Sequence, residues 1–239
     1  MRKFNRKYNE LRQINVQICE DHFAEGACII NLGKTSVLCS ATIDSSLPRW
    51  LKNSNSGWIT AEYSMLPRAT QQRNIREITS GKKSSRSSEI QRLIGRSIRS
   101  IFDLSLMPDK QIILDCDVIQ ADGGTRTASI TGSFISVSIA VSKLLERKIL
   151  KSNPIKNYIC AISCGIVQGQ PLLDLDYSED SVAEVDANFV FSNNSGISEI
   201  QISGEKNTFS KKQLLELYSL AEKGCNEILK IQKKILKNE

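Results

Sequence analysis

The chain has 239 residues, of which 40% are hydrophobic and 24% charged, enough for a sizeable core in one large domain or two small ones. A formal net charge of +6 favours a polyanionic partner without establishing one. The sequence shows no signal-peptide pattern and no apolar run of 18 residues. It therefore argues against a secreted or membrane-spanning protein and predicts a soluble cytoplasmic one.

The chain contains seven cysteines, no Cys-x-x-Cys pair and a single histidine, His22. Most of the cysteines lie in apolar, strand-like runs. This usage is typical of small buried thiols in a reducing compartment and argues against a zinc site.

The first half of the chain reads as strands followed by a helix. Residues 1–12 are polar and basic and are predicted to form a loose arm. Period-two alternation predicts strands, and a predicted exposed loop then leads to a helix near Ser88, capped by Ser87 or Ser88. The strands before this helix span residues 14–18, 27–32, 36–43 and 58–65, and the loop spans residues 68–86. One further strand, at residues 112–118, follows the helix.

The second half of the chain is predicted to contain a helix, a linker, further strands and a final helix. A helix is predicted from Ala128, and residues 151–157 read as a linker. Further strands are predicted at residues 158–167, 172–176, 185–191 and 197–202. Ser210 and Gln213 have the spacing of a capping box before a final helix. Strands and helices in this order predict an α+β fold with mixed sheets and packed helices.

A strand that runs through Gly123 and Gly124 directly into a helix is the most informative local feature. The free N–H groups of a helix N-terminus attract anions, and Arg126 adds a planar guanidinium suited to phosphate oxygens. The glycine patterns of a P-loop and of a Rossmann turn are both absent. These residues are about equally compatible with a phosphate-binding turn and with a tight turn that carries an exposed arginine.

Arginines crowd residues 68–99, where Glu77 and Glu89 are the only acidic residues. Arginines without acidic partners favour contact with RNA phosphates, whereas most charge runs form a solvated surface. Because aromatic residues are sparse here, backbone contact is favoured over base reading. The candidates for RNA binding are Arg68, Arg73, Arg76, Arg92, Arg96 and Arg99, of which the last three share one face of the predicted helix.

Acidic residues crowd a second stretch, at positions 174, 176, 179, 180, 184 and 186. Carboxylates beside a phosphate site would repel the substrate unless a divalent cation lay between them, and Mg²⁺ accepts one or two carboxylates plus waters and phosphate oxygens. A solvated acidic loop is the alternative, and spacing by itself favours it.

Several stretches together resemble the bacterial ribonuclease PH family, from about Leu11 to the last helix. The run Asp-Gly-Gly-Thr-Arg-Thr-Ala-Ser-Ile-Thr-Gly at residues 122–132 carries this resemblance most specifically. The matching stretches are residues 57–70, Arg86 followed by residues 89–99, residues 115–132 and residues 172–188. Residues 5–14 and 202–204 depart from the family's pattern.

The resemblance implies duplicated β-α units of the ribosomal-protein-S5 domain-2-like type. The expected domains span residues 11–141 and 157–224, followed by a C-terminal helix extension at residues 225–239. The family assembles as a hexameric ring, a trimer of dimers, which makes a homo-hexamer the expected state. No membrane partner is expected.

The implied reaction removes 3′-terminal nucleotides from precursor tRNA, and to some extent from rRNA, with inorganic phosphate as co-substrate. It releases nucleoside 5′-diphosphates and is reversible as a nucleotidyltransferase. Two alternatives from other classes are a catalytically inactive RNA-binding ring subunit and a hydrolytic 3′ exonuclease.

The resemblance also implies roles for single residues. Thr125 and Arg126 match the family's phosphate-binding motif, with close backbone approach at Gly124. Arg86 matches an arginine that contacts phosphate across a dimer contact. Asp180 and Asp186 match the acidic pair associated with Mg²⁺, so the expected catalytic residues are Arg126, Asp180 and Asp186. Arg68, Arg73 and Arg76 match the loop that grips tRNA.

Overall fold

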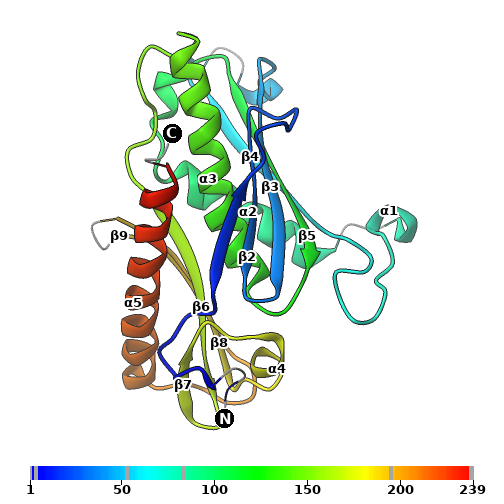
Figure 1. The fold of residues 1–239 in the computed structure, drawn as a ribbon, viewed down its shortest axis with the longest axis vertical. Helices are drawn as coiled ribbons and strands as arrows, with labels where there is room; N and C mark the ends of the chain where they lie inside the picture. The colour runs from blue at the N-terminus through cyan, green and yellow to red at the C-terminus, as the bar shows by residue number, and fades with distance from the viewer. Residues whose placement is uncertain (1, 3–4, 52–53, 82–83, 194–195, 237–239) are drawn as a thin grey trace.

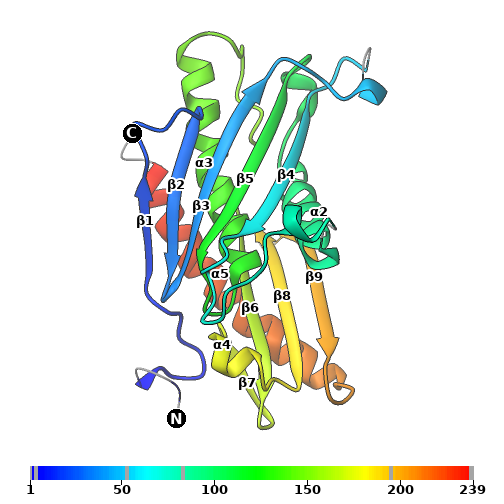
Figure 2. The same cartoon turned by 90° about the vertical axis from the view of Figure 1, so that its right-hand side faces the viewer.

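The computed structural model describes residues 2, 5–51, 54–81, 84–193 and 196–236 (Figure 1). Two β-sheets, offset along the long axis of the molecule (Figure 2), are held together by helices. This arrangement confirms the predicted α+β class.

The first sheet has the order β1-β2-β3-β5-β4 and is mixed, because β4 runs parallel to β5 while the other pairs are antiparallel. Alternation of side chains buries one face, as with Val37, Cys39 and Ala41 on β3. Its strands are β1 (Ile14–Ile18), β2 (Gly26–Leu32), β3 (Thr35–Asp44), β4 (Trp58–Met65) and β5 (Gln111–Gln120).

The helices α2 (Ser85–Arg99) and α3 (Thr125–Glu146) cover that buried face. The structure corrects the predicted start of α2: Ser84 is the N-cap, and its hydroxyl accepts the N–H of Ser87. The short helix α1 (Glu77–Ser80) lies in the preceding loop, and single 3-10 turns lie at Arg49–Leu51 and Leu104–Leu106.

The second sheet, with the order β7-β6-β8-β9, is antiparallel throughout. Its strands are β6 (Ile159–Val167), β7 (Gln170–Leu173), β8 (Val185–Ser192) and β9 (Gly196–Gly204), and α4 (Tyr177–Asp180) lies between β7 and β8. Because α3 contacts one face of β6 and α5 (Lys211–Leu236) the other, β6 is buried almost throughout.

Helix α5 begins with the predicted capping box, in which Ser210 and Gln213 exchange hydrogen bonds. It continues without a break through residue 225, where the sequence predicted the start of a C-terminal extension. The expected boundary between residues 224 and 225 therefore falls within α5. Residues 237–239 lie outside the described part of the chain.

Helix α3 is long and apolar enough to span a membrane by length and composition, yet 78% of its most apolar window is buried inside the protein, as in the core helix of a soluble protein. One expectation from the sequence is wrong. The described residues of the N-terminal arm are not loose, because Arg2, Arg6 and Arg12 form ion pairs with Asp174 and Glu179.

Candidate active site

The glycine turn before α3 lies against the acidic segment of the second sheet. Both Gly123 (φ 79°) and Gly124 (φ 67°) adopt the left-handed conformation that favours glycine. A Cβ atom on Gly123 would lie 2.5 Å from the backbone oxygen of Leu175. Glycine therefore permits a contact between two segments that are distant in the sequence.

Helix α3 begins at Thr125, with Gly124 as its N-cap residue. The Thr125 hydroxyl is buried and forms a 2.8 Å hydrogen bond with the hydroxyl of Tyr63 on β4. Burial raises the pKa of Tyr63, so this phenol stays protonated and holds the first turn of α3 in place.

Arg126 projects from the same turn, and its side chain is 14% exposed. Its Nη1 donates to Oε1 of Gln201 on β9 at 3.3 Å and lies 3.7 Å from Oε1 of Glu89 on α2. Arg86, one helical turn before Glu89, is exposed. The N-terminus of α3 thus carries the guanidinium of Arg126, which contacts with β9 and α2 hold in place.

Asp180 and Asp186 lie near these arginines. Asp180 ends α4, which corrects the expected loop, and Asp186 lies on β8. Burial raises the pKa of Asp186, and repulsion from Asp180 raises it further, while Arg126 and Arg86 oppose both effects. Burial likewise raises the pKa of Asp180 against the same two arginines. The two arginines and the two aspartates therefore lie close enough to influence one another's charge.

Neighbouring groups orient the Asp186 carboxylate and fix the backbone that carries Asp180. Asn188 donates its amide to the two oxygens of Asp186 at 3.3 and 3.4 Å. Asp176 caps α4 by accepting the N–H groups of Ser178 and Glu179. Asp180 is thereby held at the end of a short, capped helix rather than on an unsupported loop.

The pair of aspartates fits a divalent cation. Two partly buried carboxylates that repel each other are relieved by a cation between them, and Mg²⁺ takes few protein ligands beside waters and phosphate oxygens. Within the described residues, no group of three or more His, Cys, Asp or Glu side chains forms a fuller metal cage.

The predicted RNA-binding arginines divide into two groups. Arg68, Arg73 and Arg76 are exposed on the loop around α1, which projects from the body of the molecule (Figure 1). Arg92 is exposed on α2. The other two have partners within the chain.

Arg96 forms a 2.6 Å ion pair with Glu199 on β9. Arg99 donates to the backbone oxygen of Ile59 at 2.6 Å and lies over the ring of Trp58, 4.4 Å from its centroid. The helical face that these residues share is thus partly occupied by contacts with the strands beside it.

Sequence reasoning missed several residues that support the site, namely Tyr63, Asn188 and Gln201. Tyr63 could have been found as a member of the buried face of β4, with Ile59 and Ala61. Asn188 could have been found from its spacing, because it lies two residues after Asp186 on the same strand. Gln201 carries no local signal, because its partner Arg126 is distant in the sequence.

Comparisons with known proteins show the family of the chain. Domain 1 of the 3′ exoribonuclease family matches residues 10–142, and domain 2 of that family matches residues 157–224. The chain belongs to the 3′ exoribonuclease family. Ribonuclease PH of Caulobacter vibrioides, in two strains, is 48% identical over 233 residues, which are 98% of this chain and 98% of that protein.

Solved structures of other proteins share the fold of this 3′ exoribonuclease family member. Rice (Oryza sativa) Rrp46 matches with a TM-score of 0.79 at 18% identity, over 98% of this chain and all of that one. The Archaeoglobus fulgidus exosome with RNA bound to the active site matches with a TM-score of 0.79 at 21% identity, over 96% and 91%. At these identities the likeness concerns the fold.

Proposed function

We propose that this protein removes nucleotides from the 3′ end of RNA by phosphorolysis and releases nucleoside 5′-diphosphates. The observation that carries this proposal is the meeting of the α3 N-terminus and Arg126 with two partly buried carboxylates, in a chain of the 3′ exoribonuclease family. Precursor tRNA, and some rRNA, is the proposed substrate class. A cytoplasmic homo-hexameric ring, a trimer of dimers, is the proposed assembly.

Inorganic phosphate is proposed to bind at the start of α3. The N–H groups of this helix terminus, near Gly124 and Thr125, carry partial positive charge, and Arg126 and Arg86 supply full charges. An oxygen of the bound phosphate attacks the phosphorus of the last phosphodiester. The bond to the penultimate ribose 3′-oxygen breaks, and this oxygen takes up a proton.

The products are a nucleoside diphosphate and an RNA shortened by one nucleotide. Because a phosphodiester is exchanged for a phosphoanhydride at the same phosphorus, the concentration of phosphate decides the direction. Arg126 stabilises the charge that grows on the phosphoryl oxygens. No protein nucleophile is needed.

Asp180 and Asp186 are proposed to hold Mg²⁺, which when bound would neutralise charge on the phosphoryl and leaving oxygens. Without it, these carboxylates would repel both the phosphate and the RNA. The backbone of the RNA is proposed to run along Arg68, Arg73, Arg76 and Arg92.

The first test is incubation of the protein with 3′-extended tRNA, with and without phosphate. Release of nucleoside diphosphates only when phosphate is present is the expected result. Monophosphates released without phosphate would indicate the hydrolytic alternative, and no release under either condition would indicate the inactive RNA-binding subunit.

Arg126→Ala is expected to lower kcat/KM for phosphorolysis by about 10²–10³-fold, the cost of removing one charge-stabilising donor. Binding of tRNA should stay within about twofold of the wild type. Arg147→Ala, an exposed arginine at the other end of α3, is the matched control. Equal losses of binding and turnover in Arg126→Ala would contradict the assigned role.

A further inference from the structure

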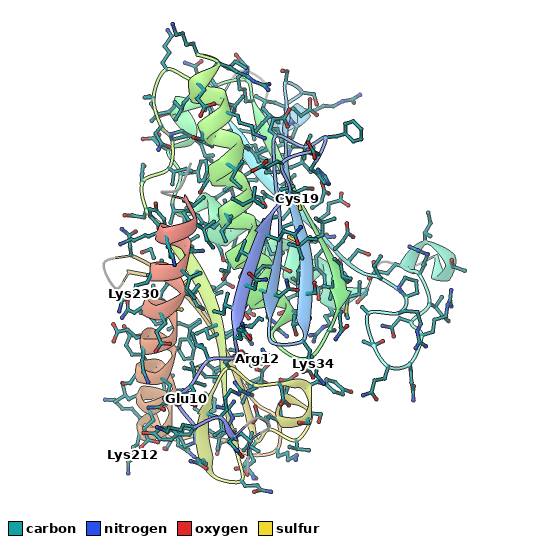
Figure 3. All side chains as sticks on the ribbon, viewed as in Figure 1. Glu10, Arg12, Cys19, Lys34, Lys212 and Lys230 are labelled. Carbon is teal, nitrogen blue, oxygen red and sulfur yellow. The ribbon has the colours of Figure 1, made fainter. Side chains whose placement is uncertain are left out.

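The guanidinium of Arg12 joins the two halves of the molecule next to the candidate active site. Arg12 precedes β1, and its residue is 8% exposed. Figure 3 shows Arg12 where the first sheet meets the segment around α4. Its backbone N–H and its Nε donate to Oδ2 of Asp174 at 2.7 and 3.0 Å, and its Nη2 lies 2.6 Å from Oδ1.

The same side chain also binds the glycine turn. Its Nη1 donates to the backbone oxygen of Asp122 at 2.5 Å, and its Nη2 to that of Gly123 at 3.4 Å. A planar guanidinium fixes the directions of its donors, so a buried one that binds two segments also sets their separation.

Both segments lead directly to groups of the candidate active site. Gly123 lies three residues before Arg126. Asp174 is fully buried and adopts φ 56°, and the chain continues from it through α4 to Asp180. A shift of Asp174 relative to Asp122 would therefore change the space between the α3 N-terminus and the carboxylates.

We propose that Arg12 is a positioning residue for phosphorolysis, which holds the glycine turn and the Asp174–Asp180 segment at the separation that phosphate binding requires. It acts through these two segments and touches no substrate atom. This inference rests on the proposed function and assigns a role to the part of the chain that departs from the family's pattern.

A neighbouring arginine supplies a control for the loss of a buried charge. Arg6 lies 3.4 Å from Oδ2 of Asp174 and 3.2 Å from Oε2 of Glu179. Among the described residues, its hydrogen bonds go to Glu10, Asp174 and Glu179 and not to the turn. Arg6→Gln thus weakens the arm without releasing the turn.

The experiment compares Arg12→Gln, Arg12→Lys and Arg6→Gln by thermal denaturation, RNA binding and phosphorolysis kinetics. Arg12→Gln is expected to raise KM for phosphate about 10- to 100-fold, since small displacements of reacting groups are costly. Its affinity for RNA should stay within about twofold of the wild type.

Arg12→Lys separates positioning from stability. A lysine retains the charge beside Asp174 but has no fork to reach the turn as well. Its Tm should recover most of the loss seen in Arg12→Gln, whereas KM for phosphate stays raised about tenfold. Arg6→Gln should lower Tm with KM for phosphate unchanged.

Two outcomes would overturn the inference. One is a KM for phosphate in Arg12→Lys that returns to the wild-type value together with Tm. The other is an equal rise of KM in Arg6→Gln. If the wild type shows no phosphorolysis, the proposed function fails separately from this inference. The role of Arg12 in phosphate binding is then tested by the rise of Tm with added phosphate: a smaller rise in Arg12→Lys than in the wild type supports it, and an equal rise contradicts it.

Discussion

Asp186 illustrates how position decides the chemistry of a single residue. The sequence places it on an alternating strand, but the structure sets it opposite Asp180 with Asn188 bonded to both of its oxygens. Burial and a like charge make the pair costly by itself, and the two arginines relieve only part of that cost. Such a pair is suited to a cation that arrives with the substrate.

Asp186→Asn is expected to lower kcat about 10²-fold and to raise the Mg²⁺ concentration needed for half-maximal activity, because one negative ligand is lost. The measurement is a Mg²⁺ titration of phosphorolysis at saturating RNA. Glu184→Gln serves as control, since Glu184 belongs to the same acidic stretch but accepts the N–H of Gly169 in a hairpin. An unchanged Mg²⁺ requirement in Asp186→Asn would remove Asp186 from the metal site.

The loop around α1 is an exposed basic element that lies apart from the core. Residues 68–76 are mostly exposed and carry arginines with few acidic neighbours, and they project from the body of the protein (Figure 1). A basic segment away from the core adds little to folding. It is free to follow an RNA backbone through charge contacts.

Arg73→Ala combined with Arg76→Ala is expected to weaken RNA binding and to reduce the slope of log K against log salt by about 0.7 for each lost single-strand phosphate contact. Binding is measured over a series of salt concentrations. Removal of Lys212 and Lys230, which are exposed on α5 (Figure 3), should leave the slope unchanged. Equal slopes for the loop variant and the wild type would exclude phosphate contact by the loop.

For the whole molecule, the burial of carboxyl groups on folding makes the free energy of unfolding depend on pH. Burial and the nearby Glu62 raise the pKa of Asp117 on β5, and burial, Glu62 and Asp117 raise that of Asp115. A carboxyl group with a raised folded-state pKa stabilises the fold fully below its ordinary pKa of 3.8. That contribution is lost as pH rises through the folded-state pKa.

Asp117→Asn is therefore expected to have a higher Tm than the wild type at neutral pH, and the gain should vanish below pH 3.8. Asp44→Asn is the control of opposite sign, because a hydrogen bond from Ser46 lowers the pKa of that exposed carboxyl. Denaturation curves over a pH series provide the measurement. A higher Tm of Asp117→Asn that persists at acidic pH would show that the charge of Asp117 is not its cause.

The strands of the first sheet, the capping box of α5 and the glycine turn before α3 were predicted correctly because each depends on neighbours in the sequence. Side-chain alternation, an Ser-x-x-Gln spacing and paired glycines act within a few residues. The cap of α2 was misplaced because four serines between positions 84 and 88 offer the same hydroxyl, and it is the Ser84 hydroxyl that accepts the N–H of Ser87.

The sequence by itself determined the order of elements, the basic loop and the family likeness of the glycine-turn motif, since pattern and motif are local. Only the tertiary structure brought Asp180 and Asp186 near Arg126 and tied Asp174 to the glycine turn through Arg12. These contacts join residues far apart along the chain. Their geometry follows from how α3 packs between the two sheets, which no local pattern specifies.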